Sequence, residues 1–223
     1  MTATRSDDLE LCFAPAAERI RRVLNVGSGP KSARKLQAVF DSESWREVRL
    51  DLDPSVEPDV LGSMTDLGTQ FAPRSFDAIW SCHSLEHLHT HEIATTLTGF
   101  QRILKPSGFA LISCPDLETV MTLFLENGSD HVVYQSAAGP ITPLDMMFGH
   151  STSIASGKLH MAHNTGFTST LLGEQLLKAG FATAITRRRN FDLWALALME
   201  GADQAAIQRK LHASGLDMSD SPE

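Results

Sequence analysis

Cysteine and long apolar runs are both scarce in this chain of 223 residues. The three cysteines, Cys12, Cys82 and Cys114, are far apart and form no C-x-x-C pair, which excludes a disulfide framework. No apolar run approaches the ~20 residues that are needed to cross a bilayer. The first residues, MTATRSDDLELCFAP, carry acids where a signal peptide has a basic start and an apolar core. We therefore expect a protein of the reducing cytoplasm with no membrane partner.

Basic residues are few as well. The chain has 19 Lys and Arg against 27 Asp and Glu, a formal net charge of −8. Because a nucleic-acid backbone demands a basic surface, this balance disfavours nucleic acid as the main partner. The one basic run, residues 187–189, is short, and we expect it to be a solvated strand end. The length suits one domain over residues 1–223, and the oligomeric state stays open.

Short apolar runs alternate with helical patterns, which is typical of a parallel sheet covered on both faces. Strands are expected over residues 21–26, 47–52, 59–63, 75–81 and 108–114, and helices over 31–40, 86–104 and 168–180. Only DPSVEP separates the second and third strands, so that either their helix is missing or the third strand is rudimentary. Residues 182–189 and 191–199 lie too close for a crossover and predict an antiparallel hairpin. A further helix is expected over 202–213, followed by a frayed tail from about residue 215.

A glycine turn joins the first strand to the first expected helix in VLNVGSGPKSARKL. Gly27 and Gly29 allow a ligand to approach the backbone, and a helix N-terminus beyond them would offer free N–H groups. A dinucleotide fold needs a third glycine where this chain has Ser32, which argues against NAD or FAD. At the end of the second strand, Asp51 can accept both hydroxyls of a ribose, while Asp53 suits an Asx turn before a proline.

Four stretches in this order, VLNVGSGP, RLDLDP, SFDAIWSCHSLEHL and RILKPSGFALISCPDLE, resemble the class I S-adenosylmethionine-dependent methyltransferases. They most resemble a bacterial branch of predicted enzymes of the methyltransferase type 11 kind. The resemblance covers residues 21–118 well and the terminal helix and hairpin in outline. It implies a Rossmann-like doubly wound α/β fold with a seven-stranded sheet, parallel except at the C-terminal hairpin. It also implies S-adenosyl-L-methionine as the cofactor.

The resemblance implies roles for ten residues around this cofactor. The methionine part would lie on the glycine loop, the ribose on the second strand's end, and the adenine and sulfonium beside the third and fourth strands. These residues are Asn25, Gly27, Ser28, Gly29, Asp51, Leu52, Ser63, Met64, Ser81 and Cys82. Asn25 and Ser63 stand where many relatives have an acid, and Asp66 is a further candidate for the adenine amine.

CHSLEHLHTHE places four histidines within residues 82–92, and His83 to His87 matches H-x-x-E-H, a zinc-peptidase signature. A catalytic zinc would need both histidines on one helix face and a third ligand. His83 follows a buried strand too closely to lie on a helix, so we expect no metal and a wall of the cofactor site instead. His87 is expected to bond a backbone carbonyl, and His89 and His91 to be solvated.

The long segment over residues 117–167 is expected to begin beside the cofactor, because the fifth strand ends at the edge that carries the glycine loop. It would close the acceptor pocket; the alternative is a dimerisation or packing flap around its Met-Met-Phe cluster. A general base could be any of five histidines: His83, His87, His150, His160 and His163. The catalytic candidates are His83 by position, with His163 and His160 from this insert.

Three functions stay open at this point. The leading expectation is methyl transfer to a small-molecule or glycan acceptor, with oxygen as the methylated atom. The others are a catalytically silent nucleotide- or S-adenosylmethionine-binding regulatory domain and a nicotinamide-dependent oxidoreductase.

Overall fold

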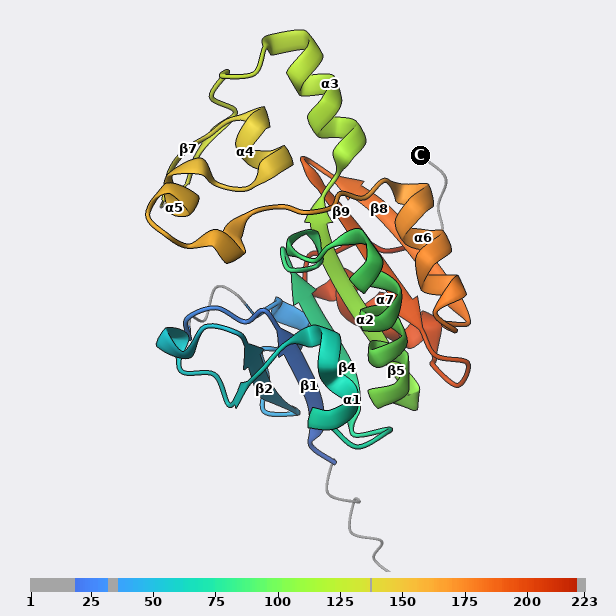
Figure 1. The fold of residues 1–223 in the computed structure, drawn as a ribbon. Coiled ribbons are helices and arrows are strands. Elements are labelled where there is room, and N and C mark those ends of the chain that lie inside the picture. The colour runs from blue at the N-terminus through green and yellow to red at the C-terminus, as the bar shows by residue number, and fades with distance from the viewer. Residues whose placement is uncertain (1–18, 32–35, 137, 220–223) are drawn as a thin grey trace, which may run out of the picture.

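The computed structural model describes residues 19–31, 36–136 and 138–219 of the chain. Its centre is a seven-stranded sheet with the order β3-β2-β1-β4-β5-β9-β8 (Figure 1). The strands are β1 (Arg21–Val26), β2 (Trp45–Asp51), β3 (Val60–Leu61), β4 (Phe76–Cys82), β5 (Leu104–Pro115), β8 (Thr183–Arg189) and β9 (Asp192–Leu198). Strand β9 pairs antiparallel with both β5 and β8, and the other pairs are parallel. The predicted fold class and hairpin are confirmed.

The register of the parallel strands brings the expected site residues to one edge of the sheet. Val26, the last residue of β1, is level with Leu50 of β2 and with Ser81 of β4. The carboxyl ends of these three strands therefore meet, as they do at the ligand-binding edge of open α/β sheets. The next residues along the chain are Gly27, Asp51 and Cys82.

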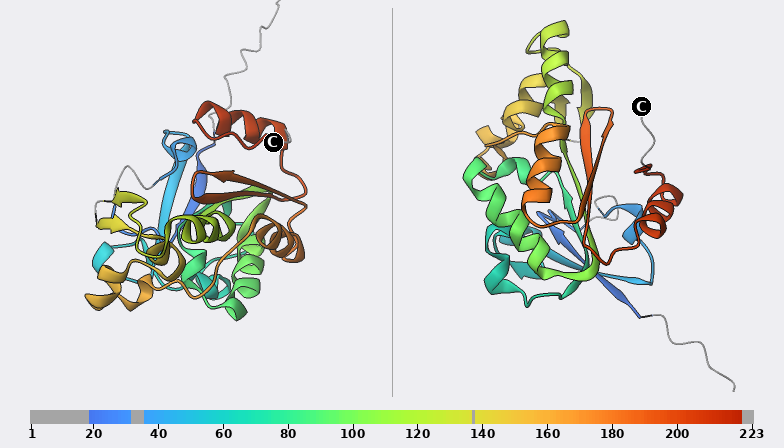
Figure 2. Two further views of the ribbon diagram at one scale, coloured as in Figure 1. Left: turned by 90° about the horizontal axis from the view of Figure 1, so that it is seen from above. Right: turned by 90° about the vertical axis from the view of Figure 1, so that its right-hand side faces the viewer.

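Helices cover the two faces of the sheet unequally (Figure 2). On one face α1 (Leu67–Gln70), α2 (Thr90–Ile103) and α6 (Ser169–Lys178) contribute apolar side chains to the larger core cluster. On the other face α7 (Gln204–Ala213) and the short 3₁₀ turn η1 (Ala38–Phe40) complete a second cluster. The central strands supply residues to both clusters, which explains their nearly unbroken apolar sequences.

Two expected helices differ from the sequence analysis. In the described part of residues 31–40 only the turn η1 is helical, and residues 32–35 lie outside the described residues. The helix expected from residue 86 begins instead at Thr90, because Glu92 accepts the N–H of His89 and closes a capping box there. Residues Leu85–His87 form a separate 3₁₀ turn, η4.

Strand β3 is rudimentary. It has two residues, and only the 3₁₀ turn η2 (Pro54–Val56) lies between it and β2. After it come the 3₁₀ turn η3 (Met64–Asp66) and the four-residue helix α1. The short DPSVEP connection therefore has both expected consequences: no α-helix lies among the described residues between β2 and β3, and β3 is rudimentary.

Residues 117–167 fold into short elements over the carboxyl edge of the sheet, at the top of Figure 1. They are α3 (Leu117–Asn127), the hairpin β6 (Tyr134–Ser136) and β7 (Gly139–Ile141), α4 (Pro143–Phe148), α5 (Ser151–Ala155) and the 3₁₀ turn η5 (Leu159–Met161). Arg188 of β8 pairs with the fully buried carboxylate of Asp116 at 2.8 Å and with Glu118 at the start of α3. The arginine run is therefore not merely a solvated strand end, because it ties the insert to the sheet.

The C-terminal tail packs for longer than its polar sequence suggests. Leu216 and Met218 are buried in the second core cluster, and Arg189 donates to the carbonyl of Gly215 at 2.9 Å. The fraying expected from about residue 215 is wrong for these residues, because two apolar side chains two positions apart reach the sheet. No helix among the described residues is long and apolar enough to span a membrane.

Candidate active site

A cavity of about 840 Å³ lies between the carboxyl edge of the sheet and the insert. Nine of the ten residues expected at the cofactor line it: Asn25, Gly27, Ser28, Gly29, Asp51, Leu52, Ser63, Met64 and Cys82. His83, His160 and His163 line it as well. Its volume is within the ~300–1,000 Å³ of small-molecule sites. Residues that are far apart in the sequence thus share one space.

The glycine loop has a shape that only glycine fits. Gly27 has a φ of +63°, and a Cβ there would lie 2.5 Å from the Oγ of Ser84 and 2.9 Å from its Cβ. Ser84 is buried, and its Oγ donates to the carbonyl of Val26 at 3.0 Å. The absent side chain therefore leaves the backbone open to the cavity, as the binding of a cofactor on this loop requires.

Asp51 fixes the same loop from the neighbouring strand. One carboxylate oxygen accepts the N–H of Gly29 at 2.7 Å, and the other accepts the N–H of Asp53 at 2.9 Å. The buried guanidinium of Arg49 donates to the carbonyls of Gly29, Val56 and Glu57. The carboxylate of Asp51 stands at the cavity wall, in the place that suits the hydroxyls of a ribose. Sequence reasoning missed Arg49, which looks like an ordinary polar position in a strand.

Two acids near the third strand, Asp66 and Asp53, were considered in the sequence analysis, the first as a partner of the adenine amine and the second as part of an Asx turn. Asp66 is exposed, does not line the cavity, and accepts a hydrogen bond from Thr69 at 2.7 Å. Asp53 accepts the N–H of Ser55 at 2.8 Å, so its Asx-turn interpretation is confirmed. Of the residues expected beside an adenine, Ser63 and Met64 line the cavity.

Ser81 is the one expected cofactor residue that does not line the cavity. It has no exposed surface, and its Oγ has no partner among the described groups. Successive strand residues point to opposite faces of a sheet, so Ser81 and Cys82 cannot both face the same space. The expectation that Ser81 borders the reacting group is wrong for this reason, and Cys82 alone keeps that place.

His83 is held by carboxylates at both ring nitrogens. Its Nδ1 lies 3.2 Å from Glu86 Oε1 and its Nε2 lies 3.4 Å from Asp192 Oδ1. Burial acts to lower the pKa of His83, but the hydrogen bonds with Asp192 and Glu86 outweigh it, and the pKa lies well above its ordinary value. The backbone of His83 has a φ of +48°, an uncommon conformation for a residue with a side chain. Asp192 was missed, although its pairing with Pro115 at the end of β5 follows from the predicted hairpin.

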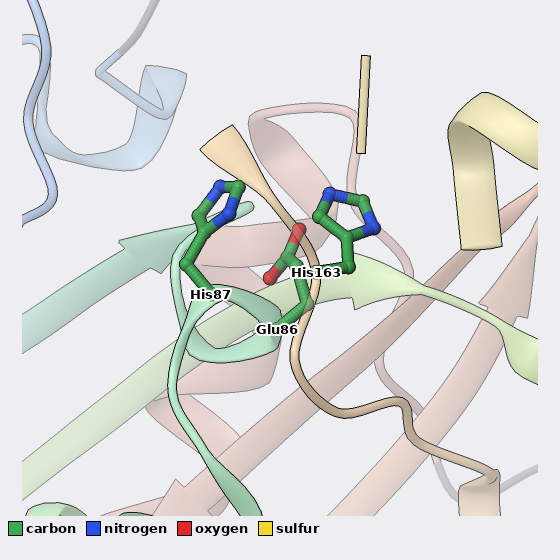
Figure 3. A group of neighbouring side chains, drawn as sticks. All are labelled: Glu86, His87 and His163. Carbon is green, nitrogen blue, oxygen red and sulfur yellow. The ribbon is translucent and has the colours of Figure 1, made fainter. Parts of the chain in front are cut away.

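Glu86 and His87 of η4 and His163 of the insert form a compact group (Figure 3). One potential ligand atom from each lies within 4.8 Å of the others. Glu86 is almost fully buried. Burial acts to raise its pKa, but the hydrogen bond and charge of His83 outweigh burial and hold the pKa below its ordinary value. Burial is the main reason that the pKa of His163 lies below the value of a free imidazole. His87 Nδ1 bonds the carbonyl of Ala162 at 3.1 Å, so the backbone bond predicted for it is confirmed.

The insert lines the other end of the cavity with polar groups. Besides the two histidines, they are Tyr134, Asp145, His150, Ser153 and Lys158. Met146 is buried in a small cluster of the insert itself, whereas Phe148 is 59 % exposed. The Met-Met-Phe stretch is therefore split between a local core and the surface. His89 and His91 are exposed as predicted, with their rings stacked 5.7 Å apart.

Comparison with known proteins agrees with this geometry. Residues 24–112 match a family described as a methyltransferase domain, and no curated protein sequence matches the chain. Among solved structures, a Burkholderia thailandensis 1,6-didemethyltoxoflavin-N1-methyltransferase with bound S-adenosylhomocysteine is similar at 20 % identity, over 81 % of this chain and 72 % of that one, with a TM-score of 0.50.

Two further structures are similar at lower identity. A SAM-dependent methyltransferase from Archaeoglobus fulgidus is 12 % identical over 81 % of this chain and 87 % of its own, with a TM-score of 0.53. The CurJ carbon methyltransferase is 11 % identical over 84 % of this chain and 50 % of its own, with a TM-score of 0.51. These likenesses concern the fold.

The matched domain, the strand order and the glycine loop with Asp51 support an enzyme of the class I S-adenosylmethionine-dependent methyltransferases. The same findings support S-adenosylmethionine as the cofactor.

Proposed function

We propose that the enzyme transfers the methyl group to an oxygen atom of a small polar acceptor held between the sheet edge and the insert. The observation that carries this proposal is the single cavity, which joins the glycine loop and Asp51 at one end to the polar side chains of the insert at the other. An acceptor seated among those side chains would lie beside the cofactor, and this is the role proposed for residues 117–167.

The polar lining favours an acceptor that carries hydroxyl groups. Tyr134, His160 and Lys158 offer donors, and Asp145 offers an acceptor, within a cavity of limited volume. A small molecule fits such a space better than a polymer does. The oxygen assignment depends on this lining, since one similar fold belongs to an N1-methyltransferase and another to a carbon methyltransferase. The glycan alternative has no support from these structures, and the cytoplasmic location stays a prediction.

The cofactor, when bound, supplies an electrophilic methyl group on a sulfonium. The protein must then align the acceptor oxygen, exclude water and receive the proton that the hydroxyl loses. Alignment alone can supply ~7–11 kcal/mol of the barrier, whereas a general base adds a factor of about 10²–10⁴. The insert would provide the alignment and the exclusion of water, and a histidine of the cavity would provide the base.

Of the three histidine candidates, the hydrogen bonds favour His163 as the base. Both ring nitrogens of His83 already face carboxylates, so that ring would have to break a bond before accepting a proton. His163 donates Nδ1–H to the carbonyl of Met146 at 2.9 Å, which leaves a lone pair on Nε2. We assign His83 to positioning, where it joins Glu86 of η4 to Asp192 of β9. His160 lines the cavity and is the second choice.

The test begins with the protein, S-adenosylmethionine carrying a deuterated methyl group, and a metabolite extract analysed by mass spectrometry. We expect a product that carries the labelled methyl group and forms only with active protein. Once an acceptor is known, His163→Gln should lower kcat by about 10²–10⁴-fold while leaving the affinity for S-adenosylhomocysteine within a factor of about two. His91→Ala, at an exposed position, is the matched control.

The two rival functions predict different results. A silent regulatory domain would bind S-adenosylmethionine but label no acceptor in the extract. An oxidoreductase would bind NAD and neither sulfur ligand. A product that carries the labelled methyl group on carbon or nitrogen would contradict the oxygen assignment, while methyl transfer to a small polar acceptor would still hold.

A further inference from the structure

We propose that Glu86, His87 and His163 bind one divalent transition-metal ion at the acceptor end of the cavity. All three residues line the cavity, and one potential ligand atom of each lies within 4.8 Å of the others. Figure 3 shows the Glu86 carboxylate between the two imidazole rings, with Glu86 and His87 from η4 and His163 from the insert. The group differs from an H-x-x-E-H zinc site, because His83 is not among its ligands and His163 lies 76 positions further along the chain than His87.

Glu86 supplies the most direct sign of a missing partner. The residue is 1 % exposed, and its Oε2 has no hydrogen-bond partner among the described groups. Its other oxygen, Oε1, is held by His83 at 3.2 Å. Buried carboxylate oxygens are almost always paired or coordinate a cation, since an isolated one is costly. The neighbouring ring nitrogens are the groups from which such a cation would draw its remaining ligands.

The two histidines are prepared in the way that metal ligands usually are. His87 Nδ1 bonds the carbonyl of Ala162 at 3.1 Å, and His163 Nδ1 bonds the carbonyl of Met146 at 2.9 Å. A neutral ring that donates at Nδ1 carries its lone pair on Nε2. Metal-bound histidines commonly donate their other ring nitrogen to a carbonyl or a carboxylate, which fixes the ring and raises its basicity. His83 holds Glu86 in the corresponding way.

Hydrogen bonds join the backbone of η4 to the segment that follows His163. The N–H groups of Asn164 and Thr165 both donate to the carbonyl of Glu86, at 2.8 and 3.2 Å, and the Asn164 side chain donates to the carbonyl of His87 at 2.8 Å. His163 is therefore placed beside Glu86 by its own neighbours in the chain. Such support from surrounding groups is what keeps a metal site in position.

The chemistry of the ligands selects the ion. Two imidazole nitrogens and one carboxylate suit Zn²⁺, Co²⁺ or Fe²⁺, whereas Mg²⁺ and Ca²⁺ prefer oxygen ligands only. With metal–ligand bonds of about 2.0–2.2 Å, ligand atoms on one tetrahedral ion lie about 3.4 Å apart. The group would have to contract by at most about 1.4 Å from its present spacing, which is within reach of side-chain rotation. Three protein ligands leave a coordination position open toward the cavity.

If the acceptor carries a hydroxyl group, as the proposed function states, the open coordination position could bind that hydroxyl. An acceptor hydroxyl bound to the ion would have a lowered pKa, as water bound to zinc does. In the metal-loaded enzyme, His163 would then be a ligand, the ion would lower the pKa of the hydroxyl, and the proton would pass to His160, the second choice of base. The ion itself needs neither the cofactor nor an acceptor to bind.

The test is a metal titration of the full chain without cofactor. Chelator-treated protein is loaded with Zn²⁺ or Co²⁺, passed through a desalting column and analysed for metal, with Mg²⁺ as the ion expected not to be retained. We expect about one Zn²⁺ or Co²⁺ per chain, a rise in the thermal midpoint with Zn²⁺, and a visible Co²⁺ absorption band of nitrogen–oxygen coordination.

Three variants and one matched control make the assignment specific. Glu86→Gln, His87→Ala and His163→Ala should each weaken Zn²⁺ binding by about tenfold or more, the range seen for supporting residues alone. His89→Ala removes an exposed histidine of the same stretch and should bind as the parent does. Circular dichroism confirms that each variant is folded, and His163→Ala, on the insert, keeps the test valid if a substitution in η4 unfolds the chain.

The metal site would be overturned if the protein retained neither Zn²⁺ nor Co²⁺. It would also be overturned if all three variants retained the ion as well as the parent does. Neither result would bear on methyl transfer, because the labelled product is measured separately and without added metal. Conversely, a chain that retains zinc but labels no acceptor would keep the site and contradict the proposed function.

Discussion

Gly27→Ala tests the cofactor loop with the smallest change available. The φ of +63° at this position costs a residue with a Cβ about 1–2 kcal/mol. The new methyl group would also lie 2.5 Å from Ser84 Oγ, well inside contact distance. Ser84 cannot easily yield, because it is buried and bonded to Val26, and overpacking of this kind costs about 1–3 kcal/mol. The loop must therefore move, and it carries the N–H of Gly29 with it.

We expect the affinity for S-adenosylhomocysteine, measured by isothermal titration calorimetry, to fall by about tenfold to several hundredfold, since each factor of ten corresponds to 1.4 kcal/mol. Gly68→Ala is the control, because a Cβ there meets nothing within 4 Å and alanine favours the helix. The double variant Gly27→Ala/Ser84→Gly removes the contact but keeps the backbone strain, so it should recover part of the loss. Binding by Gly27→Ala as tight as that of the parent would refute this account of the loop.

Three other perturbations test the ribose site and the insert. Asp51→Ala should weaken S-adenosylhomocysteine binding by about 1.5–3 kcal/mol per lost charge-assisted hydrogen bond, and calorimetry showing an unchanged affinity would place the ribose elsewhere. Asp145 caps α4 and accepts the N–H of Ser151, and although burial opposes it, this bonding lowers its pKa to about 2. A carboxyl group whose pKa is lowered in the folded state stabilises the fold above its unfolded pKa, and this stabilisation is lost as the pH falls toward 2. Asp145→Asn should therefore lower the unfolding free energy, measured in urea, by about 2 kcal/mol at pH 7 and by about half of that at pH 3. An equal loss in the control Glu126→Gln, or a loss in Asp145→Asn that does not depend on pH, would contradict this assignment. Arg188→Ala should raise protease cleavage within residues 117–167, because it leaves Asp116 buried without its cation, and an unchanged cleavage pattern would count against the tie between sheet and insert.

The parts of the fold that sequence reasoning captured are those with a short-range signature. The apolar strands, the glycine loop and the two β-rich runs on either side of Asn190 can each be recognised from a few consecutive residues. These patterns predict the parallel strands and the hairpin, whereas the seven-stranded sheet is implied by the family resemblance. The parallel strands bring Gly27, Asp51 and Cys82 together at one edge. The matches among these residues are consequences of parallel strand register and not of any single motif.

The remainder of the site depends on long-range contacts that no local pattern contains. His163 reaches Glu86 through backbone bonds that span 78 and 79 positions in the chain, and the insert's sequence shows no periodicity that would predict them. Asp192 and Ser81 are different, since strand pairing and alternation were enough to place the first in the cavity and to exclude the second. The hairpin places Asp192 beside the end of β5, and alternation along β4 lets only one of Ser81 and Cys82 face the cavity.

Isothermal titration calorimetry of the full chain with S-adenosylhomocysteine and, separately, with NAD tests the central claim most directly. We expect one S-adenosylhomocysteine bound per chain, an affinity that falls in Asp51→Ala and Gly27→Ala, and no heat with NAD. Binding of NAD together with no binding of S-adenosylhomocysteine would contradict it.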